Sequence, residues 1–236
     1  MKIELRKFLM TIDTLICVHS QDEEHDNLLV DAIESIVYGS LKPNRLVIVY
    51  DACWEKTRNL IEERLDGTHP LAIPLFNIEY VPIAKIVKQG LAVAKNFGLK
   101  FCTSEWVTYC DADDKWMNSK LEFQSQACIN FAADLCFTQS WDIRSDGALV
   151  PNCFPIGYAT SHAEIIRKIR QENCLCHGSA MIRRSVLEEL GGYNTDRKVL
   201  GAEDWDLWQR AFNQGYHFYN VPERLYCYRL GTSVAR

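Results

Sequence analysis

The chain lacks the features that would place it in several large classes of protein. None of its apolar runs approaches the ~20 residues that a membrane-spanning helix needs. The net charge is −5, which argues against a general nucleic-acid-binding protein because such proteins carry a basic excess. The segment from Met1 to Lys7 is too charged and too short to be a signal peptide. We therefore expect a cytoplasmic protein without a nucleic-acid partner.

Disulfide and zinc-site patterns are also missing, although the chain has 10 cysteines. No two of them form a Cys-x-x-Cys pair, and the cluster at 174–177 has no second cluster to complete a zinc site. Most of the others lie inside apolar runs, for example Cys17, Cys110, Cys136 and Cys227. Reduced and buried thiols are the expected state, which fits a cytosolic compartment.

The composition is that of a globular protein with a substantial core. Apolar residues make up 47% of the chain and charged residues 24%, and both values are ordinary. The 236 residues suit one α/β domain, and no repeat, low-complexity segment or clear linker divides them. We expect one domain that covers residues 1–236.

Strands and helices alternate through the first half of the chain. Strands are expected at 14–18, 45–50, 76–81 and 106–110, and helices at 27–38, 55–65 and 90–101. This alternation predicts parallel strands joined by crossover helices, with ligands outside the carboxyl ends of the strands. Polar groups follow three of the four strands, at His19–Asp22, Asp51 and Asp111–Asp113.

The second half is more mixed. Helices are expected at 121–131, 164–170, 185–190 and 203–214, and strands at 134–143, 179–182, 217–221 and 225–230. Residues 144–147 are typical of a hairpin turn, and 152–160 and 194–202 of loops. This half therefore predicts a smaller α+β unit.

The stretch 105–114 ends an apolar strand in three carboxylates within four residues. Asp111 and Asp113 are two residues apart, so in a strand they point to the same side. Two carboxylates at the end of a buried strand repel each other, and a hard cation such as Mg²⁺ or Mn²⁺ relieves that cost. The alternative is a plain turn after a strand, since aspartate is common in turns.

A second acidic stretch begins the helix expected at 203–214. Glu203 and Asp204 fall in its first turn, and Trp205, Trp208 and Phe212 follow at the spacing of a core-facing stripe. Acidic residues there are also stabilised by the helix dipole alone, so a catalytic role and a structural one both remain open. The segment 195–200 before it suggests a substrate-gating loop.

Taken together, these segments resemble the family 2 glycosyltransferases, the large inverting group with the GT-A fold. The resemblance runs from about Thr14 to the C-terminus. Residues 90–99 are similar to the family's Gly-x-x-x-Ala-Arg-Asn-x-Gly-Leu stretch, 109–116 to its Asp-x-Asp metal motif, and 201–208 to its Glu-Asp motif. The resemblance implies an α/β fold with a Rossmann-like, mostly parallel central sheet. The nucleotide-sugar-binding half is expected at about 12–116 and the acceptor-binding half at about 117–236.

The resemblance also implies the donor-binding residues. Asp51 would recognise the nucleotide base, with the backbone around Val18 and His19 beside it. Lys95 and Asn96 would lie near the nucleotide. The donor would be a nucleotide sugar, most often a UDP-sugar.

Metal, base and acceptor residues follow in the same way. Asp113 would be the principal ligand of Mn²⁺ or Mg²⁺, while Asp111 would contact the ribose or donor sugar and assist with the metal. Asp204 would be the general base that deprotonates the acceptor hydroxyl, in a hexosyl or N-acetylhexosaminyl transfer. Residues on the acceptor side would be Glu203, Trp205 and Gly178.

The chain departs from the family pattern in three places. Asp51 is followed by Ala52-Cys53-Trp54 instead of Asp-Gly-Ser, and Val18 and His19 replace the usual proline and threonine. The histidine of the closing Tyr-Arg-x-His segment is missing, which passes its task to Arg229 or a water. The processive Gln-x-x-Arg-Trp signature is absent, so transfer of a single sugar is expected.

Two other functions remain open. A sugar-1-phosphate nucleotidyltransferase needs a glycine-rich basic loop after the first strand, and residues 19–26 contain neither glycine nor Lys/Arg. The other is a non-catalytic relative that binds nucleotide or glycan.

The acceptor is expected to be a glycan or a lipid-linked saccharide of polysaccharide biosynthesis, with Trp141, Phe154 and Tyr158 as candidate sugar-stacking residues. The basic segment 165–170 is a faint candidate for peripheral association with the inner membrane face.

Overall fold

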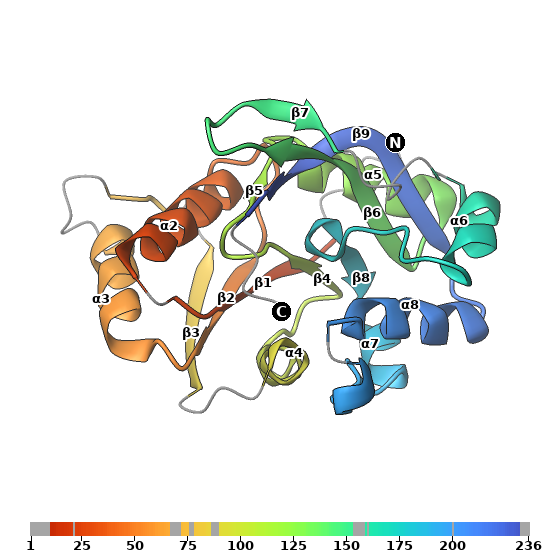
Figure 1. Cartoon of the computed structure of the whole chain (residues 1–236), viewed down its shortest axis with the longest axis horizontal. Coiled ribbons are helices and arrows are strands. Elements are labelled where there is room, and N and C mark those ends of the chain that lie inside the picture. The colour runs from red at the N-terminus through yellow and green to blue at the C-terminus, as the bar shows by residue number, and fades with distance from the viewer. Residues whose placement is uncertain are drawn as a thin grey trace.

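The computed structural model describes residues 10–20, 22–66, 72–75, 78–85, 90–152, 159, 161–199 and 201–231. The expectations for Phe154 and Tyr158, and for the ends of several loops, lie outside these residues. In these residues nine strands form one mixed sheet, and helices pack against it (Figure 1).

Four parallel strands form the first part of the sheet. Their spatial order is β3 (Glu79–Lys85), β2 (Arg45–Asp51), β1 (Ile12–Val18) and β4 (Trp106–Tyr109). Each pair is parallel and in regular register, from Asp13 opposite Arg45 onward. The expected parallel sheet is therefore confirmed.

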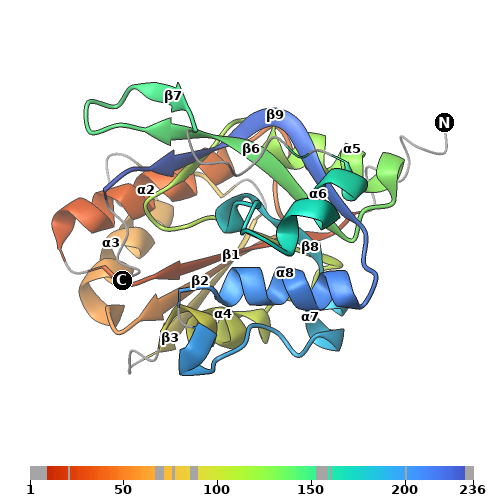
Figure 2. The same ribbon diagram turned by 45° about the vertical axis from the view of Figure 1, so that its right-hand side comes forward.

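Antiparallel pairing extends the sheet beyond β4. The order continues with β8 (Met181–Arg183), β6 (Leu135–Ile143), β9 (Phe218–Arg229) and β5 (Lys115–Trp116). The strand β7 (Leu149–Pro151) pairs with β6 across the predicted hairpin turn and projects beyond the sheet (Figure 2). Strands β6 and β9 run parallel, so the second half is mixed as expected.

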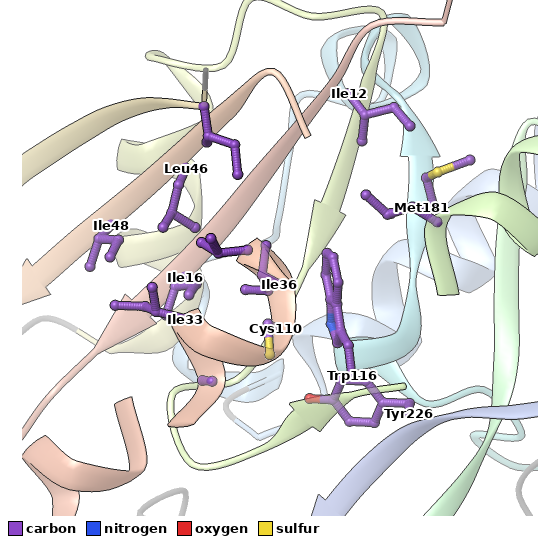
Figure 3. Packing of buried hydrophobic residues seen from close by; sticks show 14 of the residues in the cluster. Ile12, Ile16, Ile33, Ile36, Leu46, Ile48, Cys110, Trp116, Met181 and Tyr226 are labelled. Carbon is purple, nitrogen blue, oxygen red and sulfur yellow. The ribbon is translucent and has the colours of Figure 1, made fainter. Parts of the chain in front are cut away.

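Side chains of one strand alternate between two cores because successive residues point to opposite faces. Ile16 of β1 packs on one face, in what we call the α2-side core, which α2 (Glu23–Val37), α3 (Trp54–Leu65) and α5 (Lys120–Phe131) cover. Figure 3 shows the isoleucines of α2 and of the strands meeting in this core.

The opposite face forms the α8-side core. Leu15 of β1 packs there, beneath α4 (Leu91–Leu99), α6 (His162–Ile169), α7 (Arg184–Glu189) and α8 (Glu203–Asn213). Two short 3₁₀ turns, at His177–Ser179 and Arg197–Val199, complete this side. Helices thus cover both faces, which leaves the carboxyl edge of the parallel strands for a site.

The third strand and the first helix differ from their expected limits. The third strand runs over 79–85 instead of 76–81, because it pairs with β2 along its whole length; as an edge strand it tolerates Pro82. The helix expected at 27–38 begins at Glu23, because the Asp22 side chain caps it by accepting a hydrogen bond from the His25 backbone N–H.

The last two expected strands are in fact one strand, β9. Its register against β6 shifts on both sides of Gln139, so that Val221 lies opposite Thr138 and Arg224 opposite Gln139. Pro222 lacks an N–H and falls within this bulge, which explains why the sequence reads as two strands. The two-residue strand β5 had no sequence signal.

Within the part of the chain that the structure describes, no helix is both long and apolar enough to cross a membrane. Nine of the cysteines lie in that part, and all nine are free thiols.

Candidate functional site

The carboxyl edge of the parallel strands has a switch point between β1 and β4. From β1 the chain builds β2 and then β3 on one side, and returns to place β4 on the other side. Such a point leaves an open crevice at the strand ends, where ligands of α/β sheets bind. At this edge His19 follows β1, Asp51 is the last residue of β2, and Asp111 follows β4, as the sequence predicts.

The base corner, which we define as residues Val18, His19, Asp51 and Cys53, forms where β1 and β2 end. The Nδ1 atom of His19 lies 2.6 Å from the backbone oxygen of Asp51. Because a carbonyl oxygen only accepts, Nδ1 carries the proton. The Cys53 thiol donates to the backbone oxygen of Val18 at 3.3 Å. The residues expected around the nucleotide base therefore lie together.

Ala52 shows how this corner turns without the usual glycine. Its φ of 61° is in the left-handed region, which non-glycine residues seldom adopt. Asp26 supports the corner from below: its Oδ1 accepts from Ser20 Oγ at 2.5 Å and from Thr57 Oγ1 at 2.8 Å. Sequence reasoning missed Asp26, because its place in the α2 helix was read as a loop.

The aspartates after β4 belong to a turn and not to the strand. β4 ends at Tyr109, and the Asp114 N–H donates to the Asp111 oxygen at 3.1 Å. The alternation argument for Asp111 and Asp113 is therefore wrong, although both stand at the strand end. Asp114 is fully buried in the turn, Trp116 lies in β5, and the helix begins only at Lys120.

Four carboxylates and one ammonium group gather beside this turn. We call Asp111, Asp113, Glu203 and Asp204 the carboxylate cluster. Loss of hydration raises the pKa of Asp111 to about 6; the Lys95 ammonium opposes this shift, and the other three carboxylates add to it. The two acidic stretches, some ninety residues apart in sequence, therefore lie within electrostatic reach of each other.

Lys95 joins the two halves of the chain. Its Nζ lies 3.1 Å from Glu203 Oε1, and the two residues are only 3% and 8% exposed. Lys95 also stands 5.0 Å from the centre of the Tyr193 ring. A buried charge needs a partner, so this ion pair locks the start of α8 against α4.

Asp204 is held by two hydrogen bonds. Asn173 Nδ2 donates to Oδ2 at 2.9 Å, and the Trp205 N–H donates to Oδ1 at 2.7 Å. Loss of hydration raises the pKa of Asp204, while Lys95 and the two hydrogen bonds oppose that shift. Such a carboxylate is fixed in direction and more basic than an ordinary exposed aspartate.

Two other expected site residues have structural partners. Asn96 exchanges hydrogen bonds with the Tyr193 backbone at 2.7 and 2.8 Å, which ties α4 to the chain after α7. Trp205 is partly buried and donates from Nε1 to the Ile169 oxygen at 2.7 Å. Of the expected stripe, Trp208 is fully buried, while Trp205 and Phe212 pack against the α8-side core partly buried. The other buried residues of α8 are Glu203, Leu207 and Ala211.

Gly178 faces the turn directly. A Cβ atom at this position would lie 1.9 Å from Tyr226 Oη and 3.0 Å from Asp111 Oδ2. His177, just before it, is buried and places Nε2 2.8 Å from the Tyr193 hydroxyl. Loss of hydration, with Lys95 nearby, lowers the pKa of His177 well below its usual value, so the ring is neutral.

Comparison with known proteins adds a family to this geometry. The model of glycosyl transferase family 2 matches residues 15–191, which is more than half of the chain. The chain belongs to glycosyl transferase family 2. A second model, the N-terminal domain of galactosyltransferase, matches residues 160–230.

Family 2 relatives support the assignment along most of the chain. EpsE of Bacillus subtilis, described as a glycosyltransferase, is 26% identical over 211 residues, which are 85% of this chain and 68% of EpsE. The amylovoran biosynthesis glycosyltransferase AmsE of Erwinia amylovora is 24% identical over 226 residues, covering 93% and 77%.

Solved structures of similar fold confirm the GT-A class. S. aureus TarS 1-349 in complex with UDP-GlcNAc has a TM-score of 0.69 at 14% identity, over 96% of this chain and 60% of TarS. The mannosyltransferase PcManGT from Pyrobaculum calidifontis, in complex with GDP-Man and Mn²⁺, has a TM-score of 0.67 at 17% identity, over 95% and 58%. The chain spans about 60% of the length of the TarS structures.

The carboxylate oxygens beside the turn are suitable ligands for a divalent cation whose other ligands come from the substrate. Among the described residues no group of three or more His, Cys, Asp or Glu side chains is arranged around a metal site. Asp111 and Asp113 supply hard oxygen atoms, and Mg²⁺ commonly uses one or two carboxylates with substrate phosphates as the remaining ligands. Loss of hydration is the main cause of the raised pKa of Asp111, and the neighbouring carboxylates add to it, so a cation at this position would relieve part of the cost.

Proposed function

We propose that this family 2 protein is a metal-dependent, inverting glycosyltransferase that moves one sugar from a nucleotide-sugar donor to an acceptor hydroxyl. The observation that carries the proposal is the carboxylate cluster at the switch point. Two carboxylates on the donor side and one fixed carboxylate on α8 lie within electrostatic reach of one another. Metal binding, leaving-group stabilisation and proton removal all need carboxylates in that arrangement.

The base corner would hold the nucleotide. The Asp51 carboxylate accepts hydrogen bonds from donor groups on the base edge, while the protonated Nδ1 of His19 is occupied by the Asp51 backbone. With Nδ1 as donor, Nε2 of a neutral His19 ring is an acceptor. Complexes of two structural neighbours contain UDP-GlcNAc and GDP-Man. We favour a UDP-sugar as donor, with a GDP-sugar as the competing choice for the test.

Asp113 and Asp111 would hold the divalent cation together with the donor diphosphate. The chemistry that a cation supplies there is neutralisation of the charge that develops on the leaving diphosphate. Lys95 is held beside the same carboxylates by Glu203 and keeps Asp111 more acidic than burial alone would leave it. Asp111 can therefore be ionised near neutral pH.

Asp204 would act as the general base. Asn173 and the Trp205 N–H hold its two oxygens, so the carboxylate presents one fixed direction to an incoming hydroxyl. Its raised pKa favours removal of the proton as the new bond forms. Attack from the face opposite the leaving diphosphate inverts the anomeric centre, by the same geometric logic as in inverting glycosidases.

The acceptor would be a hydroxyl of a glycan or a lipid-linked saccharide. Names of two relatives support a polysaccharide context, since they assign those proteins to amylovoran and teichuronic acid biosynthesis. Trp141 of β6 lies beneath Arg224, whose guanidinium carbon is 5.4 Å from the ring centre. This pair borders the part of the sheet where acceptor selectivity is expected.

A donor screen tests the proposal. We would measure thermal shift and hydrolysis of UDP- and GDP-sugars by the protein with Mn²⁺, and again with EDTA. The expected result is Mn²⁺-dependent stabilisation by one nucleotide class together with slow donor hydrolysis. Nucleotide binding without turnover would support the non-catalytic relative instead, and metal-independent turnover would contradict the metal assignment.

A further inference from the structure

Residues of β9 make hydrogen bonds to the turn at 111–114 that contains the aspartates. Tyr226 of β9 accepts a hydrogen bond from the Asp111 N–H at 3.2 Å and donates its own proton to Asp114 Oδ2 at 2.7 Å. Its oxygen also lies 3.5 Å from Asp111 Oδ2. One buried hydroxyl thus touches the backbone at the start of the turn and the side chain at its end.

Arg229, three residues further along β9, adds two bonds to the same turn. Its backbone N–H donates to Asp114 Oδ1 at 2.7 Å, and its Nε donates to the Asp113 backbone oxygen at 2.8 Å. We call the contacts of Tyr226 and Arg229 with the turn the β9 clamp. Because they reach both backbone and side-chain atoms, they restrain the turn more than a single bond does.

Space around the Tyr226 hydroxyl is fully used. The residue is completely buried in the α2-side core, and Figure 3 places its ring beside Trp116 at one end of that core. On the other side stands Gly178, where any side chain would overlap the hydroxyl. The ring cannot move away without opening the core, so its oxygen stays at the turn.

We propose that Tyr226 is a positioning residue for the donor site: its hydroxyl orients the turn so that Asp111 and Asp113 face the cation and the diphosphate. This inference rests on the proposed function, because it assigns those two carboxylates to metal and donor. Removal of the hydroxyl leaves the Asp111 N–H and the Asp114 carboxylate short of a partner. Groups that orient metal ligands commonly change metal affinity about 10- to 100-fold when they are lost.

The test compares Tyr226→Phe with Tyr219→Phe. Tyr219 lies on the same strand, but its ring stacks on Phe131, with the centres 4.1 Å apart, away from the turn. Calorimetry with UDP, and in parallel GDP, would be done with and without Mn²⁺. We expect Tyr226→Phe to weaken Mn²⁺-dependent nucleotide binding about 10- to 100-fold. Tyr219→Phe should change it by less than about twofold, since it removes a hydroxyl far from the ligands.

A stability control separates positioning from general loosening. Ile33→Val, in the α2-side core, lowers stability without touching the turn. Mn²⁺-dependent binding that is equally weak in Ile33→Val and Tyr226→Phe, or unchanged in Tyr226→Phe, would overturn the inference. If the wild-type protein binds neither nucleotide, the proposed function fails. In that case hydrogen exchange of the Asp111 amide tests whether the β9 clamp restrains the turn. The exchange must accelerate in Tyr226→Phe and not in Tyr219→Phe.

Discussion

Two aspartate sites at the same edge of the sheet are built in opposite ways. In the base corner, His19 and Cys53 make hydrogen bonds to the backbone oxygens of Asp51 and Val18. In the carboxylate cluster, three of the four acidic side chains, Asp111, Glu203 and Asp204, interact with the buried ammonium of Lys95. The first arrangement suits recognition by hydrogen-bond direction, and the second suits binding and movement of charge.

This difference predicts how each site responds to mutation. Hydrogen bonds contribute about 1 kcal/mol each when both groups are neutral and about 1.5–3 kcal/mol when one is charged, because binding exchanges them for bonds to water. Charges that act on a transition state contribute several kcal/mol in a partly dehydrated site. Substitutions in the carboxylate cluster should therefore affect turnover strongly, and those in the base corner should affect nucleotide affinity modestly.

Asp113→Ala should have the largest effect. Loss of the proposed principal metal ligand would remove several kcal/mol of charge stabilisation, so donor turnover should fall by about 10³-fold. The measurement is Mn²⁺-dependent donor hydrolysis, with Asp146→Ala, in the exposed turn before β7, as control. If turnover survives both in the Asp113 variant and in EDTA, the carboxylate cluster does not act through a metal ion, and the contrast with the base corner fails.

Asp204→Asn should come next. Asparagine keeps the size of the side chain but cannot take a proton, so turnover should fall by roughly 10²-fold or more while donor binding is nearly intact. The control is Asp206→Asn on the same helix, a residue that pairs with Arg210 at 2.6 Å. If donor binding collapses in Asp204→Asn but not in the control, the role of Asp204 is structural.

The pH dependence of binding should differ between the two sites. In its proposed role as a metal ligand Asp111 must be ionised, and loss of hydration raises its pKa to about 6. Mn²⁺-dependent nucleotide affinity should therefore be constant above that pH and fall by up to about tenfold per pH unit below it. Binding without Mn²⁺ should lack this step. Equal pH profiles with and without Mn²⁺ would contradict the assignment of metal binding to the carboxylate cluster and of base recognition to the base corner.

Asp51→Asn should have the smallest effect. It replaces a charge-assisted hydrogen bond to the base with a neutral one, which lowers nucleotide affinity by about five- to tenfold. Glu55→Gln, an exposed residue in the first turn of α3, controls for the change in net charge. A loss of 10²-fold or more in turnover would mean that the base corner also takes part in catalysis.

Sequence patterns located the parallel half of the fold well. Its strands are short apolar runs and its helices carry regular apolar faces, so local signals sufficed for β1, β2, β4 and the helices between them. The edge strand β3 and the bulged strand β9 were placed less well. Their limits depend on partners distant in sequence, such as β2 and β6.

The candidate site likewise has features that local sequence signals predict and features that depend on contacts distant in sequence. The sequence alone determined which carboxylates stand at strand and helix ends, and its motifs pointed to family 2, because those signals lie within a few residues of each other. Only the tertiary structure decided that Asp111 sits in a turn, that Lys95 pairs with Glu203, and that Tyr226 closes on the turn beside Gly178. Lys95 and Glu203 are 108 residues apart in the sequence, Tyr226 and Asp111 are 115 apart, and no local pattern encodes which buried polar groups will meet.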